Sequence, residues 1–376
     1  MSEQHLHIVS FDIPYPANYG GVIDVFYKIK ALYHAGFKLH LHCFQYNRDP
    51  AQDLKKYCES IHYYPRLTSF LSLLTVKPYI VYSRRSGKLL ENLLKDKYPI
   101  LFEGLHSCYY LDHHQLSDRV KIYRESNIEH QYYYQLSKAE KNIFKKFFFI
   151  FASLKLRLFQ NVLSKASLML TVSKEDNNYL ILRFPGVRVE YLPSFHRDDE
   201  VKIIPGKGNF ILYQGNLGVA ENFRAAEFLI REVFRNTDRQ LVIAGLNPPD
   251  HLVRLINNHP NITLIANPTD ERMSELIRTA QINLLVTFQE TGLKLKLLNA
   301  LFNGRFCLVN PGMITGTELG PLCEIGKDAN ELRQKIDELM EITFDEQWIN
   351  HRREILMKWH SNLENCKKLR DLLLQL

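Results

Sequence analysis

The stretch INLLVTFQETGLKLKLLNALFNGRFCLVN, residues 282–310, contains a complete strand–helix–strand pattern. Residues 282–288 form an apolar run of strand length, and residues 306–310 form another. Between them leucines recur at helical spacing, which predicts a helix from Thr291, its N-cap, to Asn303. Two buried strands joined by a helix are the repeating unit of an α/β fold with parallel sheets.

The same alternation extends in both directions along the chain. Before residue 282, apolar runs at 210–215, 241–245 and 261–266 are each followed by a segment of helix length. The first half has its own series: HIVSF (7–11), KLHLHCF (38–44), PILFE (99–103), VKIYR (120–124) and LMLTVS (168–173). The polar, turn-rich segment 193–208 separates the two series. We therefore expect two doubly wound domains, residues 1–195 and 196–350, and a C-terminal helix over 351–376 packing back toward the first domain.

Composition limits the class of protein. The 376 residues are 45% hydrophobic and 24% charged, which is typical of a globular protein, and the net charge of +7 suits anionic partners. Six cysteines without C-x-x-C spacing favour a reducing compartment. The N-terminal residues do not resemble a signal peptide, and the longest apolar run, FFFIFASL (147–154), is too short to cross a bilayer. These features predict a cytoplasmic protein, and no nucleic-acid-binding module is evident.

Ligands of doubly wound sheets bind beyond the carboxyl ends of the strands, where the helix after residue 288 begins. Thr291 and Gly292 at its start predict an anion site, because the first N–H groups of a helix are unpaired. Lys294 adds a positive charge, and Lys296 shares a face with Asn299. By position alone, two lysines extending from a helix edge into solvent are the simpler interpretation.

Residues 291–319, TGLKLKLLNALFNGRFCLVNPGMITGTEL, resemble the donor-binding segment of GT-B glycosyltransferases related to glycosyltransferase family 4. Many bacterial members carry a G-x-K-x-K-x-L-E-A variant of this segment. GLKLKLLNA matches it except that Asn299 replaces the glutamate. Glu290 is the nearest match to the family's other glutamate, one residue out of strict spacing.

Four further segments are similar to the same family, so the resemblance covers most of the chain. They are a first glycine-bearing loop (14–32), an arginine-plus-Asn-x-Glu segment (123–136), a stretch where backbone groups of the family usually meet the base (265–287), and the opening strand, loop and helix of the second domain (210–230). The family's usual Arg/Lys pair after that strand is missing. The resemblance implies a GT-B fold, two Rossmann-like domains facing across a cleft. It also implies retaining, metal-independent transfer of a sugar, without a cofactor, from a nucleotide-diphosphate donor to a glycan or lipid-linked acceptor in bacterial surface polysaccharide synthesis.

The resemblance also assigns roles to individual residues. The catalytic candidates are His106, Glu290 and Lys294. The donor-binding candidates are Gly20, Gly21, Gly215, Asn216, Thr291, Gly292, Lys296 and Asn299. Several of these have a structural alternative: Asn216 shaping a turn, His106 packing in the fold, Gly20 and Gly21 forming a plain turn. Glu103, at a strand end, is either a sugar ligand or a satisfied carboxylate.

The segment SKAEKNIFKKFFFIFASLKLRLFQNVLSK (137–165) interleaves basic residues with phenylalanines. One interpretation is an amphipathic helix lying on an anionic membrane at the inner face of the cell membrane. The other, which we favour from sequence, is a long helix whose apolar side belongs to the core.

Two other function classes share the expected fold. A GT-B sugar-nucleotide epimerase would act on the donor without an acceptor. A non-catalytic GT-B scaffold would bind nucleotide or a partner without turnover, as Asn299 and the missing basic pair suggest.

Overall fold

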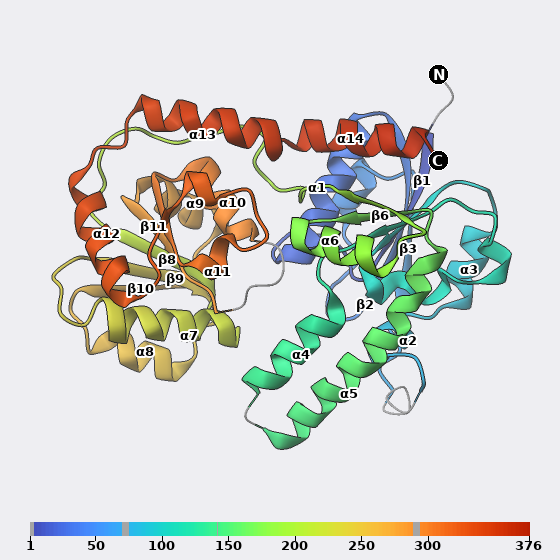
Figure 1. Ribbon diagram of the computed structural model, residues 1–376, viewed down its shortest axis with the longest axis horizontal. Helices are drawn as coiled ribbons and strands as arrows, with labels where there is room; N and C mark the ends of the chain where they lie inside the picture. The colour runs from blue at the N-terminus through green and yellow to red at the C-terminus, as the bar shows by residue number, and fades with distance from the viewer. Residues whose placement is uncertain (1–3, 70–74, 141, 289–293) are drawn as a thin grey trace. The chain divides into compact units, whose positions relative to one another are not determined.

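The computed structural model describes residues 4–69, 75–140, 142–288 and 294–376, which form two compact units (Figure 1). Of the described residues, unit 1 contains those up to His196 and the segment Asn362–Leu376, and unit 2 contains residues 197–288 and Lys294–Ser361. The division after His196 lies one residue beyond the expected boundary. Each unit is an α/β structure around a parallel sheet, as the alternating apolar runs predict.

Unit 1 is built on a seven-stranded parallel sheet with the order β3-β2-β1-β4-β5-β6-β7. Its strands are β1 (Gln4–Ser10), β2 (Phe37–Gln45), β3 (Ser60–Pro65), β4 (Ile100–Glu103), β5 (Lys121–Arg124), β6 (Leu168–Thr171) and β7 (Arg188–Tyr191). Its helices are α1 (Gly20–His34), α2 (Tyr79–Tyr82), α3 (Gly87–Leu93), α4 (Glu129–Ala139), α5 (Ile143–Phe159), α6 (Lys174–Arg183) and α14 (Asn362–Leu374). Chain order reverses beside β1, so polar residues following β1 and β4 are brought to one edge.

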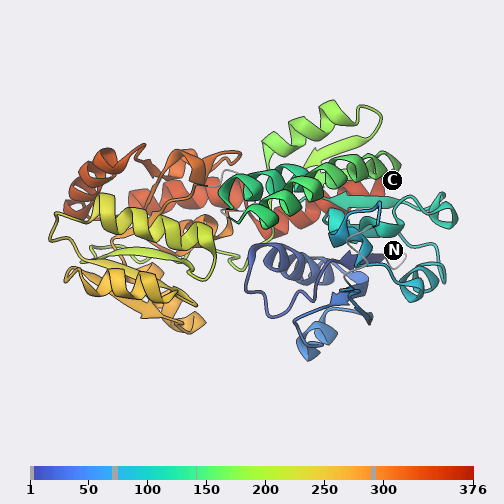
Figure 2. The same cartoon turned by 90° about the horizontal axis from the view of Figure 1, so that it is seen from below.

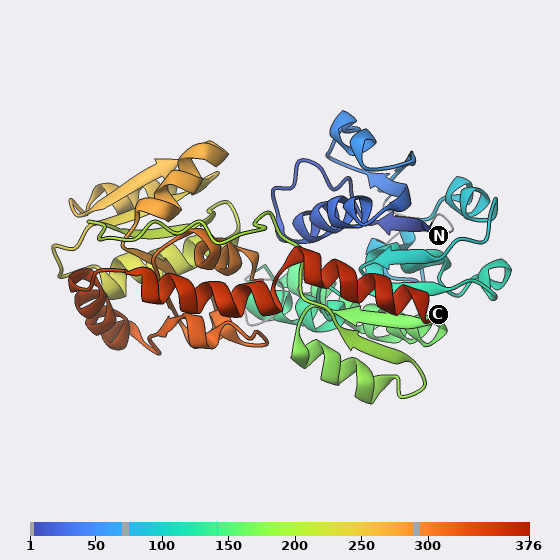
Figure 3. The same ribbon diagram turned by 90° about the horizontal axis from the view of Figure 1, so that it is seen from above.

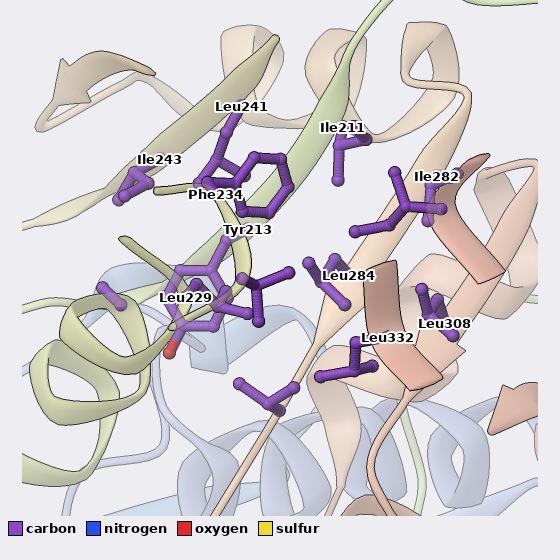
Figure 4. Close-up of a cluster of buried hydrophobic side chains, with 14 of the residues drawn as sticks. Ile211, Tyr213, Leu229, Phe234, Leu241, Ile243, Ile282, Leu284, Leu308 and Leu332 are labelled. Carbon is purple, nitrogen blue, oxygen red and sulfur yellow. The ribbon is translucent and has the colours of Figure 1, made fainter. Parts of the chain in front are cut away.

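Unit 2 is built on a six-stranded parallel sheet with the order β10-β9-β8-β11-β12-β13. Its strands are β8 (Ile211–Asn216), β9 (Leu241–Leu246), β10 (Ile262–Ala266), β11 (Ile282–Leu285), β12 (Phe306–Val309) and β13 (Glu324–Ile325). Its helices are α7 (Ala220–Phe228), α8 (Asp250–Asn257), α9 (Asp270–Thr279), α10 (Leu295–Asn303), α11 (Pro311–Ile314), α12 (Ala329–Glu341) and α13 (Glu346–Trp359). Figure 4 shows the core on one face of this sheet, where fully buried side chains of four strands meet.

Two glycines expected in a loop lie in the first turn of α1. Gly20 and Gly21 are its first two residues, after the extended residue Tyr19. A Cβ atom on Gly21 would lie 2.7 Å from the ring of Phe11, whereas one on Gly20 would meet nothing within 4 Å. Gly21 therefore serves the packing of the loop after β1, a contact that the sequence pattern did not show.

The C-terminal segment forms two helices instead of the single helix expected over 351–376. Helix α13 starts at an Asp345 cap whose carboxylate accepts from Gln347 N–H at 2.9 Å, and it ends before His360. Helix α14 follows as a separate segment (Figure 3). Within unit 1 the side-chain amide of Asn362 bonds the backbone of His196 in both directions, at 3.1 and 2.7 Å. This pairing fixes the start of α14 in unit 1.

Helices α4 and α5 pack as a pair in unit 1 (Figures 1 and 2). On α5 only Ser153 and Leu156 are buried, whereas seven large apolar side chains are exposed: Ile143, Phe144, Phe147, Phe148, Phe151, Leu154 and Leu158. The favoured expectation that the apolar side of this helix is core is therefore wrong.

With its 3₁₀ continuation, α5 is the single helix among the described residues (Ile143–Lys165) long and apolar enough to cross a membrane, judged by length and composition alone. One such helix is weak evidence for a span. The helix is longer than the eight-residue apolar run 147–154, on which the prediction from the sequence rested.

A chain of hydrogen bonds crosses the first three strands of unit 1. His7 Nε2 lies 3.0 Å from the Asp96 carboxylate, His7 Nδ1 lies 2.9 Å from His42 Nε2, and His42 Nδ1 lies 2.8 Å from the Tyr64 hydroxyl. Because a carboxylate only accepts, the donors run from Tyr64 through His42 and His7 to Asp96 when both imidazoles are neutral. Burial lowers the pKa of His7 to about 4, against the opposing effect of Asp96, and holds the pKa of His42 well below its usual value.

Candidate functional site

Polar side chains gather at the carboxyl ends of β8 and β11 in unit 2. Lys296, on α10, donates from Nζ to Asn222 Oδ1 at 3.2 Å. Asn222, in the first turn of α7, donates to the backbone carbonyl of Asn216 at 3.0 Å. The neighbouring Glu221 accepts a hydrogen bond from Thr287, which follows β11. We call these five residues the β8 edge cluster.

Lys296 is the cation of this cluster. Its Nζ lies 5.7 Å from the centre of the Tyr213 ring, a cation–π distance. Burial lowers the pKa of Lys296, and the Glu221 carboxylate opposes that shift. A desolvated ammonium with one amide oxygen as its hydrogen-bond acceptor has donors left for an anion.

The backbone at the end of β8 is shaped by the same residues. The Asn216 side-chain oxygen accepts from Gly218 N–H at 3.1 Å, which makes Asn216 a turn-forming residue. A Cβ atom on Gly215 would lie 3.1 Å from the amide carbon of Asn222. Glycine at 215 therefore lets the Asn222 side chain cross the strand end and reach Lys296.

A second group lies at the carboxyl ends of β1 and β4 in unit 1, and we call it the β4 edge cluster. It consists of Phe11, Arg84, His106 and Glu129. Arg84 donates to the carbonyl of Phe11 at 2.7 Å, and the Phe11 and His106 ring centres are 5.5 Å apart. His106 Nδ1 lies 3.6 Å from a carboxyl oxygen of Glu129, the first residue of α4.

The local backbone explains how His106 reaches this position. Gly104 follows β4 with φ +70°, a conformation that side chains with a Cβ rarely adopt. A Cβ atom at 104 would also lie 3.2 Å from His106 Nδ1. The short 3₁₀ segment Leu105–Tyr110 then carries the ring toward Glu129.

Burial sets the charge state of this cluster. It raises the pKa of Glu129 to about 8, although Arg84 opposes the shift, and it holds the pKa of His106 well below its usual value. At neutral pH the carboxyl is therefore mostly protonated and the imidazole is neutral. The Arg84 guanidinium has its pKa lowered to about 10 by burial and remains the cation of the group.

Glu103 belongs to a different, fully satisfied network. Its two carboxylate oxygens accept from Lys28 Nζ at 2.7 and 2.9 Å, and Lys28 also donates to Asp24 at 2.8 Å. Arg124 completes the network through Asp24 at 3.1 Å and the carbonyl of Leu192 at 2.6 Å. Glu103 and Arg124, the last residues of β4 and β5, therefore hold the sheet together. Their side chains are committed to this network and are not left to bind a sugar.

No set of three or more His, Cys, Asp or Glu side chains among the described residues is arranged to hold a metal ion. All six cysteines are free thiols.

No family model matches the sequence. One relative is described as an uncharacterised 44.6 kDa protein in the cps region of Klebsiella pneumoniae. It is 26% identical over 369 residues, which cover 93% of this chain and 91% of the relative.

Solved structures match the chain along nearly its full length. HepE of Anabaena in complex with UDP-glucose gives a TM-score of 0.68 at 12% identity and covers 100% of both chains. A glycosyltransferase of Rickettsia africae gives 0.65 at 12% identity, covering 99% of this chain and 98% of the other. The lipopolysaccharide outer core galactosyltransferase WaaB gives 0.64 at 13% identity, covering 99% of each.

The fold is GT-B. The predicted α/β class is confirmed, because the structural neighbours with two parallel sheets of this kind are GT-B glycosyltransferases. Family 4 and the specific lysine-bearing motif are not established by these matches, whose identities are low.

The site residues predicted in the second half of this GT-B chain, catalytic and donor-binding together, fall into three groups. Gly215, Asn216 and Lys296 lie together at the carboxyl end of β8. The others that can be placed are Lys294, which precedes α10, and Asn299, whose side-chain oxygen accepts from Asn303 at 2.9 Å. Glu290, Thr291 and Gly292 lie outside the described residues. The helix itself begins at Leu295, so a start at Thr291 was placed too early.

In unit 1 of the GT-B fold, the predicted residues also separate. His106 lies in the β4 edge cluster, whereas Gly20 and Gly21 begin α1. Sequence reasoning missed Arg84, Glu221 and Asn222, and it named Glu129 only as part of a motif. The position of Glu221 and Asn222 in the first turn after β8 was a usable signal.

Proposed function

We propose that this GT-B protein is a retaining glycosyltransferase that moves a hexose from a nucleotide-diphosphate sugar to a glycan or lipid-linked acceptor in bacterial surface polysaccharide synthesis. The observation that carries the proposal is the partly buried Lys296 ammonium at the carboxyl end of β8, which is held by Asn222. A cation at that edge of a doubly wound sheet suits a diphosphate. The HepE structures, which contain UDP or UDP-glucose, and the relative in a cps region support the substrate class.

In this proposal Lys296 takes the place of the Arg/Lys pair that the family resembled by this chain usually carries after the first strand of the second domain. The diphosphate leaving group gains negative charge as the glycosidic bond breaks, and a fixed cation lowers the energy of that state. Asn222 holds Lys296 in place, and Glu221 holds Thr287. Lys294 adds a second charge at the start of α10. No metal is needed for this role.

Glu290, Thr291 and Gly292 lie just before these lysines in the sequence, and their roles are also part of the proposal. We propose that Thr291 and Gly292 contribute backbone N–H groups to the diphosphate, and that Glu290 binds hydroxyls of the donor sugar. For His106 we propose the catalytic role that the resemblance implies. These assignments rest on the resemblance and on the positions of the described neighbours.

The acceptor end of the proposal rests on α5. Ile143, Phe147, Phe151, Leu154 and Leu158 recur at helical spacing and form one exposed apolar stripe. Such a stripe is costly in water, and an acyl-chain boundary would cover it.

Basic side chains border this stripe. On a helical projection the exposed Lys146 and Arg157 flank one side of it, as an anionic surface requires. We propose that α5 lies on an anionic membrane at the inner face of the cell membrane, where lipid-linked acceptors are found.

Calorimetric titration with UDP, GDP and other nucleoside diphosphates tests the donor site, followed by mass spectrometry of products with the corresponding sugar nucleotide. Transfer to an added glycan or lipid acceptor with retained anomeric configuration is expected. A sugar nucleotide isomerised at unchanged mass would show an epimerase, and nucleotide binding without any turnover or hydrolysis would show a scaffold. Absence of binding to every nucleotide would overturn the donor proposal.

Vesicle sedimentation tests the membrane contact. Wild type should bind vesicles containing anionic lipid and weaken as salt rises, because lysines contribute a screened attraction. The double variant Phe147→Ser/Phe151→Ser should lose binding, while the control Ile181→Ser, another exposed apolar residue on α6, should bind like wild type. Equal binding to neutral vesicles, or a dimer that the double variant abolishes, would contradict the proposal.

A further inference from the structure

His106 and Glu129 form a pair whose proton arrangement is not fixed by any other contact among the described residues. His106 Nδ1 is buried and has no hydrogen-bond partner in the part of the chain that the structure describes. The Glu129 carboxyl oxygen lies 3.6 Å from this nitrogen, and a small rotation of either side chain would bring the two atoms to hydrogen-bond distance. Glu129 keeps only 3% of its surface exposed.

The two edges of the His106 ring differ. Nδ1 is buried, yet 21% of the side-chain surface is exposed, so the accessible part lies on the other side of the ring, where Nε2 is. The protonation of Nδ1 therefore decides what Nε2 offers to a ligand. A neutral imidazole carries one N–H and one lone pair, on opposite nitrogens.

Several charged and titratable side chains surround His106 and Glu129. Arg84 acts on both residues, and Arg66 acts on His106. Tyr133, on α4, and Glu125 and Tyr123, at the end of β5, face Glu129 and are themselves affected by its charge. Arg84 is committed to two backbone carbonyls, those of Phe11 at 2.7 Å and Ile80 at 2.6 Å. It supplies a positive potential to the pair, while its hydrogen bonds go to these two carbonyls.

We propose that Glu129 is a positioning residue that sets the tautomer of His106, so that Nε2 meets its ligand as an N–H donor at neutral pH. The protonated carboxyl donates its O–H to Nδ1, which leaves the ring proton on Nε2. The ligand, a sugar oxygen, rests on the proposed transferase function; the tautomer itself does not.

Loss of the Glu129 proton reverses the arrangement. A carboxylate only accepts, so the ring proton moves, through solvent, from Nε2 to Nδ1 and is donated to Glu129. The pair then holds one proton fewer, which has passed to water, and Nε2 presents a lone pair. Because burial raises the pKa of Glu129 to about 8, the change occurs on the alkaline side of neutrality. Ordinary imidazoles titrate on the acid side.

Two-bond ¹H–¹⁵N spectra of protein labelled with ¹⁵N-histidine test this directly, without substrate. The His106 signals are identified by their loss in His106→Gln. We expect Nε2–H near pH 6.5 and a growing share of Nδ1–H between about pH 7 and 9. In Glu129→Gln the side-chain amide donates to Nδ1 at every pH, so the tautomer should stay Nε2–H throughout.

Glu125→Gln provides a matched control, because Glu125 is also a buried carboxyl after β5 but accepts from Tyr123 at 2.6 Å instead of facing His106. It should leave the tautomer change in place. Wild-type spectra alone decide the matter if a variant fails to fold. A His106 tautomer that is independent of pH, or an imidazolium forming near pH 6.5, would overturn the proposal even if transferase activity were found. Absence of transferase activity with the expected spectra would overturn only the proposed ligand.

Discussion

The edges of the two sheets handle charge in opposite ways. At the β8 edge a partly buried lysine packs against an amide and an aromatic ring, with Glu221 nearby. At the β4 edge the acid and the imidazole are both neutral at pH 7, and Arg84 is bound to backbone carbonyls. An anion therefore gains most at the β8 edge, whereas the β4 edge suits neutral hydroxyls. The same strand–helix architecture thus carries two different charge environments, each set by a few loop residues.

The difference extends to the strands themselves. β1 and β2 carry His7 and His42, both buried as neutral rings, whereas the strands of unit 2 contain no histidine. The unfolded chain takes up protons at these histidines below about pH 6.5, but folded His7 does so only near pH 4. The contribution of His7 to stability is therefore fully present above about pH 6.5 and is lost as the pH drops through this window, whereas the carboxyl of Glu129, whose pKa is raised to about 8, contributes in the opposite direction.

The largest predicted effect is the acid destabilisation that His7 contributes to unit 1. For His7 alone the shift from 6.5 to about 4 corresponds to roughly 3 kcal/mol lost by pH 4. Hydrogen-exchange mass spectrometry, corrected for intrinsic rates, should show β1 and β2 losing protection through this contribution between pH 6.5 and 4, without a matching loss in β8 and β9. His7→Gln should flatten this dependence, and the exposed control His34→Gln should not. Simultaneous loss in both units would remove the contrast between the sheets.

The second effect concerns the β8 edge. Lys296→Ala should weaken binding of the donor diphosphate by roughly 1.5–3 kcal/mol, or about 10- to 150-fold in Kd, because a hydrogen bond to a charged group is lost. Calorimetry on folded protein measures it. Lys207→Ala, an exposed lysine paired with Glu341 in the same unit, should bind like wild type. An unchanged Kd in Lys296→Ala would mean that the lysine only packs against Tyr213.

Lys294→Ala should have a smaller effect on the same titration. Lys294 and Lys296 are both partly exposed, but Lys296 is also held by Asn222 and by the Tyr213 ring, so we expect the smaller loss of about 0.5–1 kcal/mol for Lys294. Raising the ionic strength should reduce this loss more than that of Lys296→Ala. The opposite ranking of the two lysines would return the principal role to Lys294.

The smallest predicted effect is that of a chelator. Because lysines are proposed to balance the diphosphate charge, donor binding in EDTA should equal binding without it. Binding that disappears in EDTA and returns with Mg²⁺ or Mn²⁺ would show that the β8 edge works with a metal.

The strands with continuous apolar runs could be predicted from the sequence, because burial on both faces leaves a strong pattern. The strands that were missed are short or polar edge strands: β3 carries SIHYYP, β7 carries RVEY, and β13 has two residues. Edge strands are half solvated, so their sequences differ little from loops.

The site was partly predictable for the same kind of reason. Lys296 and His106 follow or precede recognisable strands, so their position was accessible from the pattern. Arg84 and Glu129 come from segments far apart in sequence, and only the three-dimensional fold brings them beside His106. The buried state of Glu129, which gives the pair its chemistry, depends on that packing and leaves no local trace in the sequence.

Helix α14 has a consequence for the order in which the chain folds. Its Cys366, Leu369 and Leu372 belong to the same core as Val25 and Ile29 of α1. During synthesis, therefore, the first sheet emerges from the ribosome long before its covering helix, while all of unit 2 is made in between. Unit 2 is able to complete its core first, and the N-terminal unit remains an unfinished intermediate that needs protection from aggregation until residues 362–374 arrive.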